Sequence, residues 1–118
     1  MRGELRSLTA MPRALPPLPE PILDAVEDID GFSAELRIEL ELPVEDVEVF
    51  AGVIDRIPPV SRAEGKRTYR GMATIDDDTL WVYVHTTGPG RCDQGAWDGS
   101  RALAAELWNS IDAVLATH

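Results

Sequence analysis

The chain has 118 residues, a formal net charge of −10 and a single cysteine, Cys92. This length suits one domain with one hydrophobic core. The acidity disfavours direct binding to nucleic acid, because phosphate contacts need clustered lysine and arginine. One cysteine excludes an intrachain disulfide. The sequence has neither an apolar run of membrane-spanning length nor a recognisable signal peptide, so we expect a cytoplasmic protein without a membrane partner.

The charge is unevenly distributed. Most acidic residues lie between positions 20 and 55, where Arg37 is the only base, and residues 56–70 reverse the sign. We therefore expect a strongly negative side and a small positive loop. The acidity has three explanations that the sequence leaves open: solubility, salt adaptation of a whole proteome, or complementarity to a basic partner. Lys66 is the only lysine, and such arginine-rich usage is typical of a GC-rich bacterial or phage genome.

The first twenty residues are interpreted as a proline-rich arm, and residues 21–118 as a single domain. The stretch MPRALPPLPEP at 11–21 lacks amphipathic periodicity, and its prolines favour an extended conformation. We expect the arm to bury little surface, so that removal of residues 1–19 leaves the fold intact.

The domain opens with two periodic segments. Residues 21–30 have apolar side chains at spacings of three and four, Pro21 at a favourable first position and Gly31 as a stop, which predicts a short helix. FSAELRIELEL at 32–42 alternates between apolar and mostly charged residues, which predicts a strand. Its charged face must contact solvent or a partner, because burial of unpaired carboxylates is costly.

The middle of the chain is predicted to form a helix, a loop and a hairpin. Residues 44–57 favour a helix, although their valines keep a strand as an alternative. Residues 58–66 are expected to form an exposed loop. RTYRGMATI at 67–75 and TLWVYVHTT at 79–87 are predicted to pair as a hairpin through a turn at Asp76–Asp78.

The last element is predicted to be a helix with Asp98 or Ser100 as its N-cap, after a glycine-rich break at 88–100. Leu103, Leu107 and Ile111 lie on one stripe of it. The expected fold class is α+β, with element order α-β-α-β-β-α and a small, mostly antiparallel sheet that carries helices on one face.

The candidate contact surface follows from the period of two in the strands. If Leu80, Val82 and Val84 join the core, then Trp81, Tyr83 and His85 lie outside beside the charged side chains of residues 32–42. In the opposite register the aromatic residues belong to the core. The sequence does not decide which face of residues 79–87 is buried. Exposed aromatic residues among charges are typical of an interface centre. The predicted partner-binding residues are Glu35, Arg37, Glu39, Glu41, Trp81, Tyr83 and His85.

No motif in the sequence indicates catalysis, a cofactor or a metal. Cys92 with His85 or His118 lacks a third orienting residue, and Asp76–Asp78 lacks the alternating ligand spacing of a calcium loop. GPGRCDQG has no Gly-Lys-Ser/Thr of a phosphate loop, and its nearby aspartates would repel an anion. We therefore expect a protein that is not an enzyme and that holds neither cofactor nor metal.

Three functional hypotheses follow. The first is a non-catalytic acidic protein-binding module, for example an inhibitor, immunity or anti-defence protein that binds a basic enzyme. The second is a structural or assembly subunit, for instance of a phage particle, that self-associates as a homo-oligomer. The third is a small ligand-binding domain or enzyme that uses a cleft near Trp81, His85 and Trp97.

Overall fold

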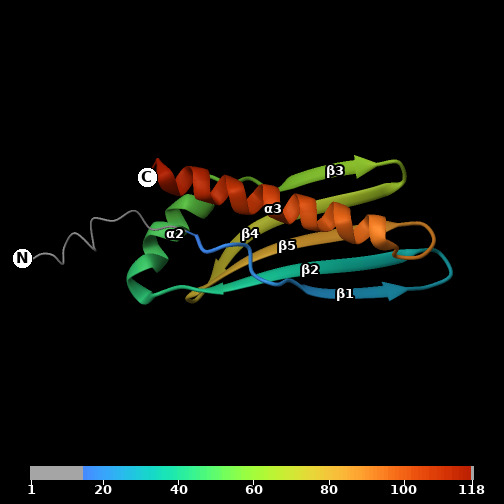
Figure 1. The fold of residues 1–118 in the computed structure, drawn as a ribbon, viewed down its shortest axis with the longest axis horizontal. Helices are drawn as coiled ribbons and strands as arrows, with labels where there is room; N and C mark the ends of the chain where they lie inside the picture. The colour runs from blue at the N-terminus through green and yellow to red at the C-terminus, as the bar shows by residue number, and fades with distance from the viewer. Residues whose placement is uncertain (1–14, 118) are drawn as a thin grey trace, which may run out of the picture.

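A computed structural model describes residues 15–117 of the chain. These residues form one five-stranded antiparallel sheet with strand order β1-β2-β5-β4-β3 and helical segments on one side of it (Figure 1). The elements in chain order are β1 (Ile22–Glu27), β2 (Phe32–Glu41), the 3-10 turn η1 (Val44–Asp46), α2 (Val47–Ile54), β3 (Val60–Glu64), β4 (Arg67–Asp76), β5 (Thr79–Gly88) and α3 (Gln94–Ala116).

The α+β class is confirmed, but the predicted element order is wrong. The described chain runs β-β-α-β-β-β-α instead of α-β-α-β-β-α. The helix predicted at 44–57 is confirmed as η1 and α2, and the alternative that these residues form a strand is wrong. The hairpin of β4 and β5 is also confirmed, and its turn places Asp77 at φ 56°.

Residues 21–30 form a strand and a turn, not the predicted helix. β1 pairs with β2 from Ile22 opposite Arg37 to Glu27 opposite Phe32. The backbone N–H groups of Asp30 and Gly31 donate to the carboxylate of Asp28, which closes the turn between the two strands. An isolated helix of this length is marginal in water, whereas the free edge of β2 supplies hydrogen-bond partners for every second residue of a strand.

Residues 58–66 contain a strand that the sequence did not reveal. β3 pairs antiparallel with β4 and turns at Gly65, whose φ of 60° suits glycine. Most of β3 is exposed, because it lies at the edge of the sheet. A strand exposed on both faces needs no alternation of polar and apolar residues, which is why its sequence resembles a loop.

The last helix begins earlier than predicted. Its N-cap is Asp93, whose side chain accepts a hydrogen bond from the backbone N–H of Ala96 at 2.9 Å. Gly95 and Gly99 therefore lie within α3, where the sequence suggested a break. A Cβ at residue 99 would meet the buried ring of Tyr69, so packing requires glycine there, whereas a Cβ at residue 95 would meet the movable guanidinium of Arg67.

The core lies between α3 and the sheet. Leu103, Leu107 and Ile111 of α3 are buried, as the sequence predicted, and they meet Leu36 of β2 and Val82 of β5. The backbone of β4 approaches α3 closely at Gly71, where an added Cβ would lie 2.7 Å from Leu107. Phe50 and Val53 close the core at the end where α2 lies (Figure 1).

The described part of the arm, from residue 15, contacts α3. The indole Nε1 of Trp108 donates to the carbonyl oxygen of Pro16 at 3.1 Å, and Leu15 packs against the core. Leu15 is half-buried, whereas Pro16, Pro17 and Leu18 are exposed, so the described part of the arm buries little surface apart from the Leu15 side chain. The remainder of the arm, residues 1–14, lies outside the described residues, and the boundary at residue 20 stays a prediction.

Removal of residues 1–19 is expected to preserve the fold but to lower the free energy of unfolding by about 1–3 kcal/mol. The truncated chain loses the Leu15 contact and leaves the buried indole N–H of Trp108 without its acceptor. Thermal unfolding followed by circular dichroism and tryptophan fluorescence measures the change. A chain that begins at Leu15 is the control, because it keeps both contacts. Equal stability of the two truncations would contradict this prediction.

Candidate functional site

The second face of the sheet carries no helix from the described residues. Figure 1 shows α3 crossing one face, and the alternating burial of β2 and β5 agrees with it. Leu80, Val82 and Val84 are buried under the helices. Trp81 and Tyr83 therefore point to the opposite side, which we call the open face. The structure decides between the two registers that the sequence left open.

The strand register places the predicted contact residues side by side. In the pairing of β2 with β5, Glu39 lies opposite Trp81, Arg37 opposite Tyr83 and Glu35 opposite His85. Glu41 continues the same row of β2 beside Thr79. The seven predicted side chains therefore lie next to one another on the open face. Their role in binding a partner stays a prediction.

The two aromatic rings of this surface stack on each other. The centroids of Trp81 and Tyr83 are 5.8 Å apart, and the ring planes differ by 13°. Both side chains are half-buried and keep part of their surface in contact with solvent. Such pairs form rigid platforms that lose little conformational entropy when a partner packs on them.

The charges beside the rings are only partly paired. Nε of Arg37 lies 3.4 Å from a carboxylate oxygen of Glu35, yet it has no hydrogen-bond acceptor among the described residues. Glu39 and Glu41 are exposed and take part in no ion pair within residues 15–117. These two carboxylates therefore remain available to a cation from outside.

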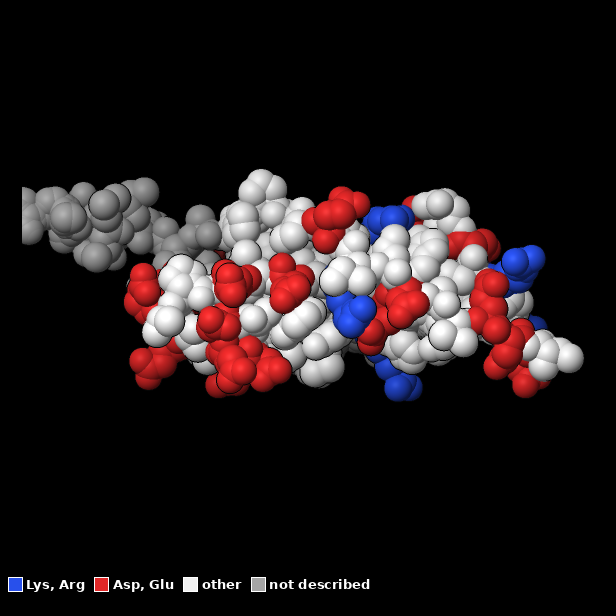
Figure 2. All heavy atoms as spheres, turned by 90° about the horizontal axis from the view of Figure 1, so that it is seen from below, with Lys and Arg blue, Asp and Glu red and all other residues white. Residues whose placement is uncertain are grey.

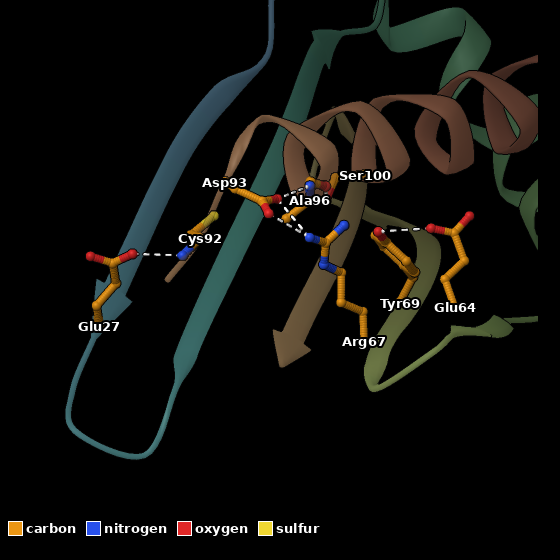
Figure 3. Close-up of polar contacts among 8 residues, drawn as sticks. All are labelled: Glu27, Glu64, Arg67, Tyr69, Cys92, Asp93, Ala96 and Ser100. Atoms are coloured by element: carbon orange, nitrogen blue, oxygen red, sulfur yellow. Dashed lines mark hydrogen bonds and ion pairs between the residues drawn. The ribbon is translucent and has the colours of Figure 1, made fainter. Parts of the chain in front are cut away.

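His85 is engaged by a neighbouring strand. Its Nε2 lies 2.7 Å from the hydroxyl oxygen of Ser33 on β2. Cys92 lies on the helix side of the sheet, just before α3, whereas His85 lies on the open face. The two residues therefore do not form a pair of nucleophile and base. Figure 3 shows the backbone N–H of Cys92 donating to Glu27, at 2.6 Å. Burial, with Glu27 and Asp93 nearby, raises the pKa of the Cys92 thiol, which disfavours the reactive thiolate.

Polar side chains of the protein itself bind at the start of α3, as Figure 3 shows. The guanidinium of Arg67 binds the carboxylate of Asp93 at 2.6 Å, and the hydroxyl of Tyr69 donates to Glu64. Asp93 also caps the helix. An anion at this helix terminus would meet a carboxylate, which agrees with the argument from sequence against a phosphate site.

The open face extends beyond the predicted residues. On β4, Arg70 lies opposite His85 and Met72 opposite Tyr83, while Ile22 of β1 lies opposite Arg37. Met72 and Ile22 are exposed, each to 45%. The sequence predicted β4 as one strand of the hairpin, but it gave no sign that Arg70 and Met72 lie on this face. No sequence signal placed Ile22 here, because β1 was interpreted as a helix.

One end of the molecule is strongly acidic. Figure 2 shows acidic side chains crowded at the end where Figure 1 places α2 and the turn between β4 and β5. Exposed acids at this end are Glu41 at the end of β2, Glu45 in η1, Glu48 in α2, and Asp76 and Asp77 where β4 turns into β5. Within residues 15–117 no group of three or more His, Cys, Asp and Glu is arranged to hold a metal ion. This acidic end adjoins the open face through Glu41 and Asp76.

The cleft suggested near Trp81, His85 and Trp97 is not formed. Trp97 packs with Phe32 and Ala34 on the helix side of the sheet, whereas Trp81 and His85 lie on the open face.

No helix among residues 15–117 is long and apolar enough to cross a membrane. Comparisons with protein-family models, curated proteins and solved structures find no match to this chain.

Proposed function

We propose that the protein is a non-catalytic binding module that uses the open face to bind a basic protein. The observation that carries this proposal is the register of β2 with β5, which sets the Trp81–Tyr83 stack directly beside Glu39 and Arg37. Tryptophan and tyrosine are enriched among the residues that dominate binding energy. The unpaired carboxylates beside them supply a charge that a lysine- or arginine-rich partner complements.

Within this class, an inhibitor of a basic enzyme fits the charge distribution best. The chain is acidic overall, and its acidic end (Figure 2) adjoins the open face, where Glu41 lies next along β2 from the side chains beside the aromatic stack. Such a surface attracts a basic partner over long range, raises the association rate and covers the partner's own nucleic-acid-binding site. The cytoplasmic location expected from the sequence is part of this proposal.

Replacement of Trp81 by alanine is expected to weaken partner binding by about 2 kcal/mol, mainly through faster dissociation. Reversal of charge in Glu39→Lys with Glu41→Lys is expected to slow association and flatten its salt dependence. The measurement is binding kinetics, at two salt concentrations, with a basic protein identified among the products of the neighbouring genes. Thermal unfolding of each variant is recorded on the same sample.

The matched control is Asp55→Lys with Asp112→Lys, which changes the net charge equally but at the C-cap of α2 and on α3. The proposal requires this control to leave the dissociation rate unchanged and to alter association less than the open-face pair does. A Trp81→Ala protein that unfolds more easily but binds normally once folded would show that Trp81 acts only in stability and would end the proposal for this surface.

A self-associating structural subunit is the second candidate, and β1 favours it. All six residues of this edge strand are exposed, including Ile22, Leu23 and Val26. Edge strands with exposed apolar side chains pair readily with strands of other molecules. Light scattering over a range of protein concentrations distinguishes the candidates: growing particles indicate self-assembly, and a constant monomer mass leaves the open face free for another protein.

A further inference from the structure

A depression lies on the open face over β5, β4 and the start of β3. Its volume is about 500 Å³, within the range of small-molecule sites. Tyr83, Met72 and Pro59 supply apolar lining, and Glu35, His85 and Arg70 supply polar groups. The polar groups belong to one row across the sheet, since Glu35 lies opposite His85 and His85 opposite Arg70.

This row has an available cation at one end. Arg70 is exposed and has no ion-pair partner among residues 15–117, whereas Arg37, the other arginine of the open face, is paired with Glu35. The Glu35–Arg37 pair also reduces the negative charge at the opposite end of the row. The free positive charge of the depression therefore lies on the β4 side.

Hydrogen-bonding groups surround the same guanidinium. A second hollow adjoins the first and is lined by Thr68, Arg70, His85 and Thr87. Ser61 of β3 lies opposite Arg70 and lines the larger depression. A guanidinium flanked by hydroxyl groups binds a planar carboxylate through paired N–H donors, and neighbouring hydroxyls can donate to the remaining lone pairs.

We propose that this depression binds a small carboxylic acid with an apolar body. The carboxylate pairs with Arg70, and the apolar body lies over Met72 and Tyr83. A single anionic group fits better than a phosphate, because one arginine faces it and the protein as a whole is acidic. The site goes beyond the proposed protein-binding function and does not require a protein partner.

The probe is 3-phenylpropionate, titrated into the full chain and followed by amide chemical shifts. The expected shifts concentrate on β4 and β5 around Met72, Tyr83 and His85. Arg70→Gln is expected to weaken binding about tenfold or more, because it removes a charge-assisted hydrogen bond. Met72→Glu is expected to abolish binding, because it places a carboxylate in the depression. Both residues are exposed, so the variants should keep the wild-type melting temperature.

Two matched controls separate the site from general electrostatics. Arg101→Gln removes an equal charge on α3 and should leave the affinity unchanged. The uncharged amide 3-phenylpropanamide should bind at least about tenfold more weakly than the acid. The proposal is overturned if the acid produces no saturable shifts, if the amide binds equally well, or if Arg70→Gln retains wild-type affinity.

The same variants distinguish the carboxylate site from the surface proposed to bind a protein partner. Glu39→Lys with Glu41→Lys should leave probe affinity within about threefold of wild type, because screening at physiological salt limits the influence of charges farther away than about 8 Å. Retained probe binding together with slower partner association in this variant supports both proposals. Failure of the probe with normal partner binding would remove the carboxylate site alone.

Discussion

Leu107→Ala is expected to lower the free energy of unfolding by about 2–5 kcal/mol, the range for large-to-small changes in a core. Leu107 is 1% exposed, and it contacts β4 at Gly71, where the missing side chain lets α3 approach closely. The shortened side chain leaves a cavity that the rigid backbone of β4 cannot fill. Denaturant unfolding followed by circular dichroism measures the loss, and Ile111→Ala should give a loss of the same order.

Asn109→Ala is the matched control, because it lies on the exposed side of the same helix and alters no core contact. Its stability should stay within about 0.5 kcal/mol of wild type. Unfolding curves for Leu107→Ala and Ile111→Ala that coincide with that of wild type would refute the packing of α3 on the sheet.

Gly99→Leu is expected to destabilise the protein by about 3 kcal/mol, although leucine is the better helix former. A Cβ at residue 99 would lie 2.7 Å from Cε2 of Tyr69 and closer still to its hydroxyl oxygen. The ring of Tyr69 is 1% exposed and has no space to move. Insertion of a side chain must therefore push α3 away from β4 or expel the ring from the core.

Gly95→Leu, one turn earlier, is the control for this effect. The atom nearest to a Cβ at residue 95 is Nη1 of Arg67 at 2.9 Å, the flexible end of a half-buried side chain, and the next is Oδ1 of Asp93 at 3.3 Å. Its displacement should cost less than about 1 kcal/mol, the usual value of an exposed ion pair. Similar losses from the two variants, measured by thermal unfolding, would show that the contact with Tyr69 does not hold the helix in place.

Predictions from the sequence succeeded where one face of an element is buried and the other is exposed to solvent. β2 and β5 alternate so regularly that their strand character, and which side chains share a side of each strand, could be predicted, and the stripe of Leu103, Leu107 and Ile111 predicted α3. The prediction failed at the two edges of the sheet. β1 and β3 are exposed on both faces, so no periodicity marks them as strands.

The candidate surface shows the same division. The sequence by itself determined that Trp81, Tyr83 and His85 share one side of a strand and that Glu35, Arg37, Glu39 and Glu41 share one side of another, because side chains of a strand alternate. It did not determine that the two sides coincide, nor that Arg70, Met72 and Ile22 join them. The tertiary structure decided this: α3 and α2 cover one face, so the more apolar side of each central strand turns toward them. The register of β2 with β5 and of β5 with β4 then brings side chains from distant parts of the chain into the same rows.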